Sequence, residues 1–292
     1  MKSWVKLFVV AVFVFLWCYL AFSGLVKLPE LDILKDMTSG IKSENNRLDW
    51  KTVDVYNKSL PEGVNKKDVS LVTGIIKIEG ISMFFRKALP STSMKSSGEA
   101  ILLLHGRSFK SETWQNLGTM NLMAGIGHLV VAVDLPGYGE TQGLYHGDKS
   151  KFILSIIQSE LLSGIHPVLI SPSMSGEYSV KFVGEHADLL SGFIPVAPVA
   201  TSSVSQDILQ TVKVPTLIVY GENDNTPMAK EAPHNLRIMP NSREVPLKDA
   251  GHAAYLDQPG SYPQEMLRTV WKEEHFLANL IRNRKDQCLV FI

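Results

Sequence analysis

A serine-rich stretch at residues 171–176 (SPSMSG) is the first candidate for chemistry in this sequence. It follows the apolar run 167–170 and precedes a helix-competent segment at 177–185. A strand, a sharp turn through small residues and a helix form the arrangement that exposes a nucleophilic serine. Ser173 is the predicted nucleophile, at the N-terminus of a helix, where the dipole favours developing negative charge. Taken alone, the motif also fits an ordinary serine-rich turn.

A serine nucleophile needs a base that takes its proton and a carboxylate that orients that base. The strand-like run 216–220 ends shortly before Asp224, and the run 242–245 is followed by His252. One class of serine enzymes built on a parallel sheet has the order serine, acid, histidine, each just past a strand end. We therefore predict Asp224 as the acid and His252 as the base, with Glu222 as the alternative acid.

Such a site also needs backbone N–H donors for the oxygen that becomes negatively charged. The apolar run 100–104 leads into His105, Gly106 and Arg107. We predict that the backbone N–H groups of Arg107 and Met174 form this oxyanion hole, and that His105 braces the loop rather than reacting. The other histidines are scattered singly, so no metal site is expected. The glycines at 134–139 lack the dinucleotide spacing, and no cofactor is predicted.

Apolar runs of strand type alternate with helical patterns through most of the chain. The strands are expected at 72–78, 81–86, 100–104, 129–133, 167–170, 193–196, 216–220 and 242–245, and the helices at 113–124, 150–162, 177–185 and 262–282. This alternation predicts an α/β fold with a mainly parallel sheet covered by helices on both faces. The segment 197–213 is short, which predicts a minimal cap and an open pocket for small or exposed acyl groups.

The N-terminal region carries an apolar stretch at residues 7–26 that is long enough for a helix to cross a bilayer. Lys2 and Lys6 precede it, and the positive-inside rule puts residues 1–6 in the cytosol. This predicts a single-pass type II signal anchor with the main domain lumenal or extracellular; a cytoplasmic pool is an alternative. A cleaved signal peptide is the competing interpretation, because residues 21–23 fit a small-x-small cleavage site.

The remaining chain divides into a polar stalk at 27–66, a catalytic domain at 67–285 and a tail at 286–292. Asn57 heads a glycosylation triplet that is usable only if the domain is lumenal. Cys18 and Cys288 are far apart in sequence, so no structural disulfide is expected.

The overall composition is that of a globular protein with a sizeable core. Of the 292 residues, 45% are hydrophobic and 20% charged, and the formal net charge is zero. The Lys and Arg residues form no basic stripe, which argues against a nucleic-acid partner.

Several of these segments together resemble the alpha/beta-hydrolase superfamily and, more narrowly, the small family of alpha/beta-hydrolase domain-containing proteins 14. The resemblance covers roughly residues 70–280 and is carried by residues 102–106, 111–119, 134–137, 171–176, 219–221 and 250–252. It implies the hydrolase fold and a charge relay of Ser173, Asp224 and His252. The apolar N-terminus is similar to that of the membrane-anchored type of this family. Serines at 171 and 175 replace the glycines of most superfamily members, a feature that this family shares.

The predicted activity is that of a serine hydrolase forming an acyl-enzyme from a small acyl-bearing ester, thioester or amide. Water completes the reaction, or another acceptor takes the acyl group. The alternative is a hydrolase fold that serves as a binding module with a vestigial triad. No protein partner follows from the sequence.

Overall fold

The computed structural model describes residues 69–90, 96–162 and 164–257. The chain divides into two units, residues 1–47 and 48–292, and all the described residues belong to the second. The predicted anchor at 7–26, the stalk with Asn57, the helix at 262–282 and the tail lie outside the described residues. Within the ranges given, no helix is both long and apolar enough to span a membrane.

The strands of the described residues form one eight-stranded sheet in the order β1-β2-β4-β3-β5-β6-β7-β8. Their bounds are β1 Leu71–Ile78, β2 Ile81–Ala88, β3 Ala100–Leu103, β4 Leu129–Val133, β5 Pro167–Pro172, β6 Gly192–Val196, β7 Thr216–Gly221 and β8 Ser242–Leu247. Strands β1 and β2 form an antiparallel hairpin, and β2 pairs antiparallel with β4. From β4 to β8 all pairs are parallel, which confirms the predicted mainly parallel sheet.

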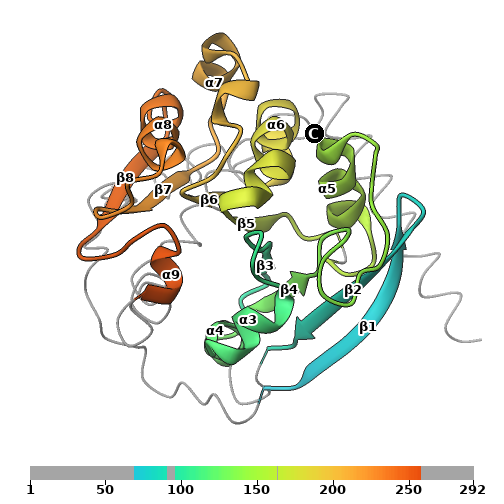
Figure 1. The fold of residues 1–292 in the computed structure, drawn as a ribbon. Helices are drawn as coiled ribbons and strands as arrows, with labels where there is room; N and C mark the ends of the chain where they lie inside the picture. The colour runs from blue at the N-terminus through green and yellow to red at the C-terminus, as the bar shows by residue number, and fades with distance from the viewer. Residues whose placement is uncertain (1–68, 91–95, 163, 258–292) are drawn as a thin grey trace, which may run out of the picture. The chain divides into compact units, whose positions relative to one another are not determined.

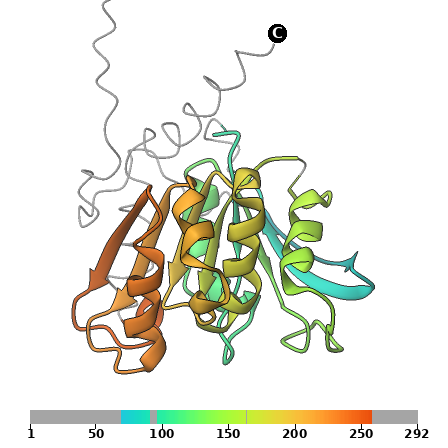
Figure 2. The ribbon, with the colours of Figure 1, turned by 90° about the horizontal axis from the view of Figure 1, so that it is seen from above.

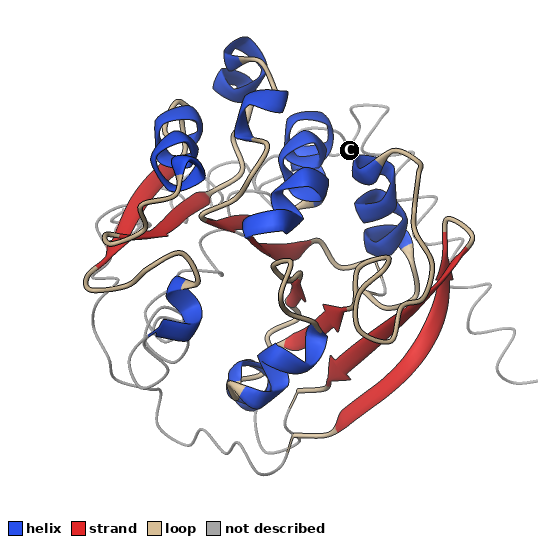
Figure 3. Ribbon diagram, in the orientation of Figure 1, coloured by secondary structure: helices blue, strands red, loops and turns tan. Residues whose placement is uncertain are grey.

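Helices cover both faces of the sheet, as predicted (Figure 1). Their bounds are α3 Ser111–Asn116, α4 Thr119–Gly125, α5 Lys149–Gln158, α6 Gly176–His186, α7 Gln206–Thr211, α8 Pro227–Leu236 and α9 Ala254–Asp257. Helices α5, α6 and α8 stand side by side over one face, which Figure 2 shows from above. Helices α3, α4 and α9 lie on the opposite side (Figure 3). A three-layer arrangement of this kind buries both faces of a parallel sheet.

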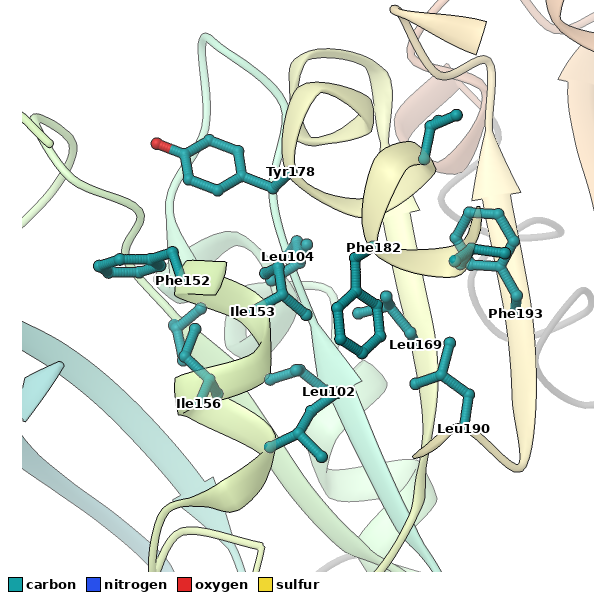
Figure 4. Packing of buried hydrophobic residues seen from close by; sticks show 14 of the residues in the cluster. Leu102, Leu104, Phe152, Ile153, Ile156, Leu169, Tyr178, Phe182, Leu190 and Phe193 are labelled. Carbon is teal, nitrogen blue, oxygen red and sulfur yellow. The ribbon is translucent and has the colours of Figure 1, made fainter. Parts of the chain in front are cut away.

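The two faces are packed by alternate residues of the same strands. In β3, Leu102 contributes to the cluster beneath α5 and α6, whereas Ile101 and Leu103 contribute to the cluster on the side of α3, α4 and α9. Figure 4 shows side chains of the first cluster; they include Leu102, Phe152, Ile156, Leu169, Phe182 and Phe193. Because both faces are buried there, the central strands β3 to β7 are mainly apolar runs, and this is why the sequence revealed them.

Two of the predicted helices differ from the structure: one is divided in two, and the other is shorter than predicted. The helix predicted at 113–124 is two helices, α3 and α4, because the backbone turns at Gly118, whose φ is +74°. A left-handed residue ends a helix, and glycine adopts that conformation without steric cost. The helix predicted at 150–162 ends at Gln158, where the extended backbone of Ser159 follows.

The connection between β6 and β7 consists of a short 3-10 helix, Thr201–Ser203, and α7. Val204 and Ile208 of this connection pack against Gly184 of α6, and Asn235 of α8 donates a hydrogen bond from Nδ2 to Thr201 Oγ1 at 3.0 Å. The connection therefore contacts α6 and α8, and it contains no large inserted lid.

Candidate active site

Ser173 lies in the turn between β5 and α6, at the carboxyl end of the parallel strands. Its φ of +49° places a non-glycine residue in the left-handed region, which costs about 1–3 kcal/mol. Residues 173–175 form a single 3-10 turn, and α6 begins directly at Gly176. The side chain is half-buried. This is the strand–turn–helix geometry predicted from the sequence, and strain at one polar residue is typical of a functional position.

The serines on either side of this turn are joined by a buried chain of hydroxyl groups. Ser171 Oγ lies 2.9 Å from Ser175 Oγ and 2.7 Å from Ser179 Oγ, and Ser175 Oγ donates to the carbonyl of Pro172 at 2.8 Å. Each hydroxyl has one proton. Since Ser175 gives its proton to Pro172, Ser171 must donate to Ser175, and Ser179 must donate to Ser171. The serines that replace glycine here are therefore fully paired, and they tie the end of β5 to α6.

His252 contacts both the predicted nucleophile, Ser173, and the predicted acid, Asp224. Ser173 Oγ lies 2.8 Å from His252 Nε2, and His252 Nδ1 lies 2.6 Å from Asp224 Oδ2. The Asp224 side chain is 1% exposed and that of His252 is 31% exposed. Glu222, the alternative acid, is exposed, and the carboxylate in contact with the histidine is that of Asp224. The geometry thus selects Asp224 over Glu222 as the partner of the imidazole.

The loops that carry the acid and the base are held together by their backbones. Asn223 N donates to the carbonyl of Ala250 at 2.9 Å, and Thr226 N donates to Asp224 Oδ1 at 2.9 Å. A Cβ on Gly221 would lie 2.2 Å from the carbonyl oxygen of Gly251. Only glycine permits this approach, so the end of β7 is fixed against the loop that precedes His252. Neither oxygen of the Asp224 carboxylate is left without a donor.

The two predicted oxyanion donors are backbone groups in the loops after β3 and β5. Neither the Arg107 N–H nor the Met174 N–H donates a hydrogen bond within the described residues. The carbonyl of Gly106 accepts from Phe109 N at 3.0 Å and lies 2.9 Å from His105 Nδ1. Because the peptide unit is planar and trans, holding this carbonyl points the Arg107 N–H in the opposite direction. A Cβ on Gly106 would lie 3.6 Å from Ser173 Cβ, so the loop closely approaches the serine.

His105 braces this loop, as predicted. Its Nε2 accepts a hydrogen bond from Leu135 N at 2.9 Å, which fixes Nδ1 as the protonated nitrogen that donates to Gly106. Burial lowers the pKa of His105, and the hydrogen bond to Gly106 opposes that shift only in part. The next turn is held in the same way, because Asp134 accepts from Ser111 N at 2.6 Å and from Glu140 N at 2.8 Å. The residues after β3 and β4 thus form one hydrogen-bonded support.

The lowered pKa of His105 predicts a pH-dependent stability. The folded state binds fewer protons than the unfolded state between the folded pKa and about 6.5. The contribution is therefore complete above about pH 6.5 and is lost as pH falls below it, by at most about 1.4 kcal/mol per pH unit. Urea unfolding at pH 7.5 and pH 5.5 measures this. The drop should be smaller in His105→Gln than in the wild type, and equal drops would contradict the assignment.

Comparisons with known proteins place the fold and the family. No protein-family model matches the chain. The human protein named "Putative protein-lysine deacylase ABHD14B" is 40% identical over 203 residues, which cover 66% of this chain and 92% of that protein. ABHD14A of Danio rerio is 40% identical over 193 residues, covering 63% of this chain and 70% of the relative. The chain belongs to the ABHD14 family of alpha/beta hydrolases. This confirms the resemblance drawn from the motifs.

Solved structures agree with this family at the level of the fold. A crystal structure described as a predicted CIB-like hydrolase from Thermoplasma acidophilum has a TM-score of 0.61 at 23% identity, covering 70% of this chain and all of that one. An esterase from Thermogutta terrifontis has a TM-score of 0.56 at 18% identity, covering 70% of this chain and 99% of its own. This member of the ABHD14 family therefore has the alpha/beta-hydrolase fold.

The sequence patterns did not identify two groups that support the site. In this ABHD14 protein, Ser179 completes the row of hydrogen-bonded hydroxyl groups. It lies one helical turn after Ser175, and this i,i+4 spacing was the only sequence pattern that could have indicated its role. Thr226 orients Asp224 through its backbone, which no residue type reveals. Within residues 69–90, 96–162 and 164–257, no group of three or more His, Cys, Asp or Glu residues is placed to hold a metal ion.

Proposed function

We propose that this protein is a serine hydrolase that cleaves an ester, thioester or amide through an acyl-enzyme on Ser173. The single observation that carries the proposal is the continuous contact from Ser173 Oγ to His252 Nε2 at 2.8 Å and from His252 Nδ1 to Asp224 Oδ2 at 2.6 Å. A serine in the left-handed region, an imidazole within reach of its proton and a buried carboxylate behind the imidazole meet the requirements of nucleophilic catalysis.

The proposed reaction begins when Ser173 Oγ attacks the acyl carbon and His252 Nε2 takes the serine proton. The carbonyl electron pair moves onto oxygen, where the Arg107 and Met174 N–H groups stabilise it. The bond to the leaving group then breaks, and the leaving group takes the proton from His252. Water attacks the acyl-enzyme in the same way and restores Ser173 with release of the acid. Asp224 holds the imidazole in the required tautomer and stabilises its charge.

The substrate class follows from the site and from the relatives. The connection after β6 contacts α6 and α8, and this supports a site for small or exposed acyl groups rather than long chains under a lid. The human relative is named as a protein-lysine deacylase, which places acylated lysine among the amides to test on this chain. If an acceptor other than water takes the acyl group from Ser173, the same machinery performs acyl transfer.

Labelling by a fluorophosphonate tests the proposal. The folded protein is expected to react with one equivalent of probe, and peptide mapping is expected to place the adduct on Ser173. A panel of acyl esters of increasing length then defines the acyl group that is hydrolysed. A folded protein that takes no label and hydrolyses no member of the panel would instead support the non-catalytic binding module.

We propose in addition that residues 7–26 anchor the protein as a type II membrane protein whose domain is lumenal or extracellular. The support is the length of the apolar run and the two lysines before it. In that location Asn57 is glycosylated. Glycosidase treatment should reduce the apparent mass of the wild type and leave Asn57→Gln unchanged; a wild type insensitive to the enzyme argues against the lumenal location.

A further inference from the structure

A tyrosine directly after the catalytic histidine loop lies beneath the predicted oxyanion hole. Tyr255 belongs to the first turn of α9, three residues after His252, and is 2% exposed. Its ring stacks on Trp114 with centroids 5.1 Å apart and meets Phe109 edge-on at 5.8 Å. Phe109 and Trp114 come from the loop after β3 and from α3. Two segments that are distant in sequence, residues 109–114 and the first turn of α9, therefore meet in one aromatic cluster under the loop that carries Arg107.

The hydroxyl group of Tyr255 is the unusual member of this cluster. Its Oη is inaccessible to solvent and has no hydrogen-bond partner within the described residues. In the same cluster, Trp114 Nε1 donates to the carbonyl of Leu104 at 2.7 Å. Buried polar groups are nearly always paired, and an unpaired one destabilises the folded protein. A phenylalanine would fill the same space without that cost, so the hydroxyl requires an explanation other than folding.

The hydroxyl lies close to the turn that carries the reacting serine. A Cβ built on Gly106 would lie 3.5 Å from Tyr255 Oη and 3.6 Å from Ser173 Cβ. The phenol and the nucleophile are thus both within van der Waals reach of one point beside the oxyanion loop. Gly106 leaves that point free of side-chain atoms.

The phenol is also a reliable proton donor. Burial raises the pKa of Tyr255. The group therefore keeps its proton at every pH at which an imidazole base operates. Its proton is directed to no acceptor among the described residues, while the two backbone donors of the same site are equally unpaired.

We propose that the Tyr255 hydroxyl is a third donor of the oxyanion hole, which pairs with the acyl oxygen when negative charge develops on it. This rests on the proposed serine hydrolase activity. A donor without a partner in the free protein gains one only in the tetrahedral state, so it stabilises the transition state more than the bound substrate. The unpaired hydroxyl then lowers the free energy of unfolding of the free protein, and it also lowers the activation free energy of the reaction.

The variant Tyr255→Phe tests this with two readouts of opposite direction. With p-nitrophenyl acetate as the probe, kcat should fall about 100-fold while KM changes less than about threefold. The melting temperature should stay equal or rise, because an unpaired buried hydroxyl is removed. Inhibition by an aryl boronic acid, which forms a tetrahedral adduct on the serine, should weaken in parallel with kcat.

Tyr220→Phe is the matched control, since its hydroxyl on β7 donates to Glu244 Oε2 at 3.1 Å and lies outside the proposed site. It should leave kcat unchanged. Wild-type kcat in Tyr255→Phe would overturn the inference and leave the proposed function standing. A loss of both activity and melting temperature would also overturn it, because the hydroxyl would then serve the fold. A wild type that neither takes the fluorophosphonate nor hydrolyses esters would overturn the proposed function, and this inference with it.

Discussion

Ser173→Ala is expected to lower kcat/KM by about 10⁵- to 10⁶-fold for any acyl ester that the protein hydrolyses, and to abolish fluorophosphonate labelling. The alanine removes the only atom that forms the acyl-enzyme, so His252 has no proton to take. The strained left-handed backbone at 173 stays strained with alanine, and the melting temperature should change little. Steady-state kinetics and intact-protein mass spectrometry measure the two effects.

Ser171→Ala is the matched control for this prediction, because it removes a hydroxyl two residues away. Ser171 accepts from Ser179 and donates to Ser175, so its loss leaves both partners short of a hydrogen bond. The expected cost is about 1–3 kcal/mol of stability, with labelling retained. If Ser173→Ala kept hydrolysis within tenfold of the wild type while Ser171→Ala lost it, the nucleophile would have been assigned to the wrong serine.

The positions of the central strands could be predicted because both faces of a parallel sheet are buried. Runs such as Leu129–Val133 are apolar at every position, and this pattern needs no information from distant parts of the chain. The positions of Ser173, Asp224 and His252 could be predicted for a related reason. Parallel strands end at one edge of a sheet, so polar residues just past those ends meet there.

Helix boundaries were less accessible, because the apolar pattern and the backbone gave conflicting signals. The apolar spacing continues across Gly118, which hid the break between α3 and α4. Helix α8 was not predicted at all. It contains Pro233, which argues against a helix in sequence, and its first residue is Pro227, whose fixed φ suits the start of a helix.

The environment of Tyr255 was inaccessible from the sequence, for a physical reason. Its ring contacts Phe109 and Trp114, which follow the central strand β3, whereas the histidine loop follows the edge strand β8. No local pattern links residues so far apart along the chain. The pairing of a hydroxyl is likewise a property of the folded packing, since the same residue type is bonded at Tyr220 and unpaired at 255.

Asp224→Asn is expected to lower kcat by about 10³- to 10⁴-fold without unfolding the site. Thr226 N donates to Asp224 Oδ1 at 2.9 Å, and the asparagine oxygen can accept the same bond. The amide nitrogen then faces His252 Nδ1, which lies 2.6 Å from Oδ2 in the wild type. An N–H donor at this place requires Nδ1 to be unprotonated, so the proton moves to Nε2. That tautomer cannot take the proton of Ser173.

Glu222→Gln separates this effect from the general loss of a negative charge at the end of β7. Glu222 is exposed, whereas the Asp224 side chain is 1% exposed, so the same acid-to-amide change at 222 should alter kcat less than about twofold. Single-turnover acylation rates compare the two variants most directly, since they exclude product release. A large loss in Glu222→Gln beside a small one in Asp224→Asn would make 222 the acid, and it would require the histidine loop to move away from the position that its 2.6 Å contact defines.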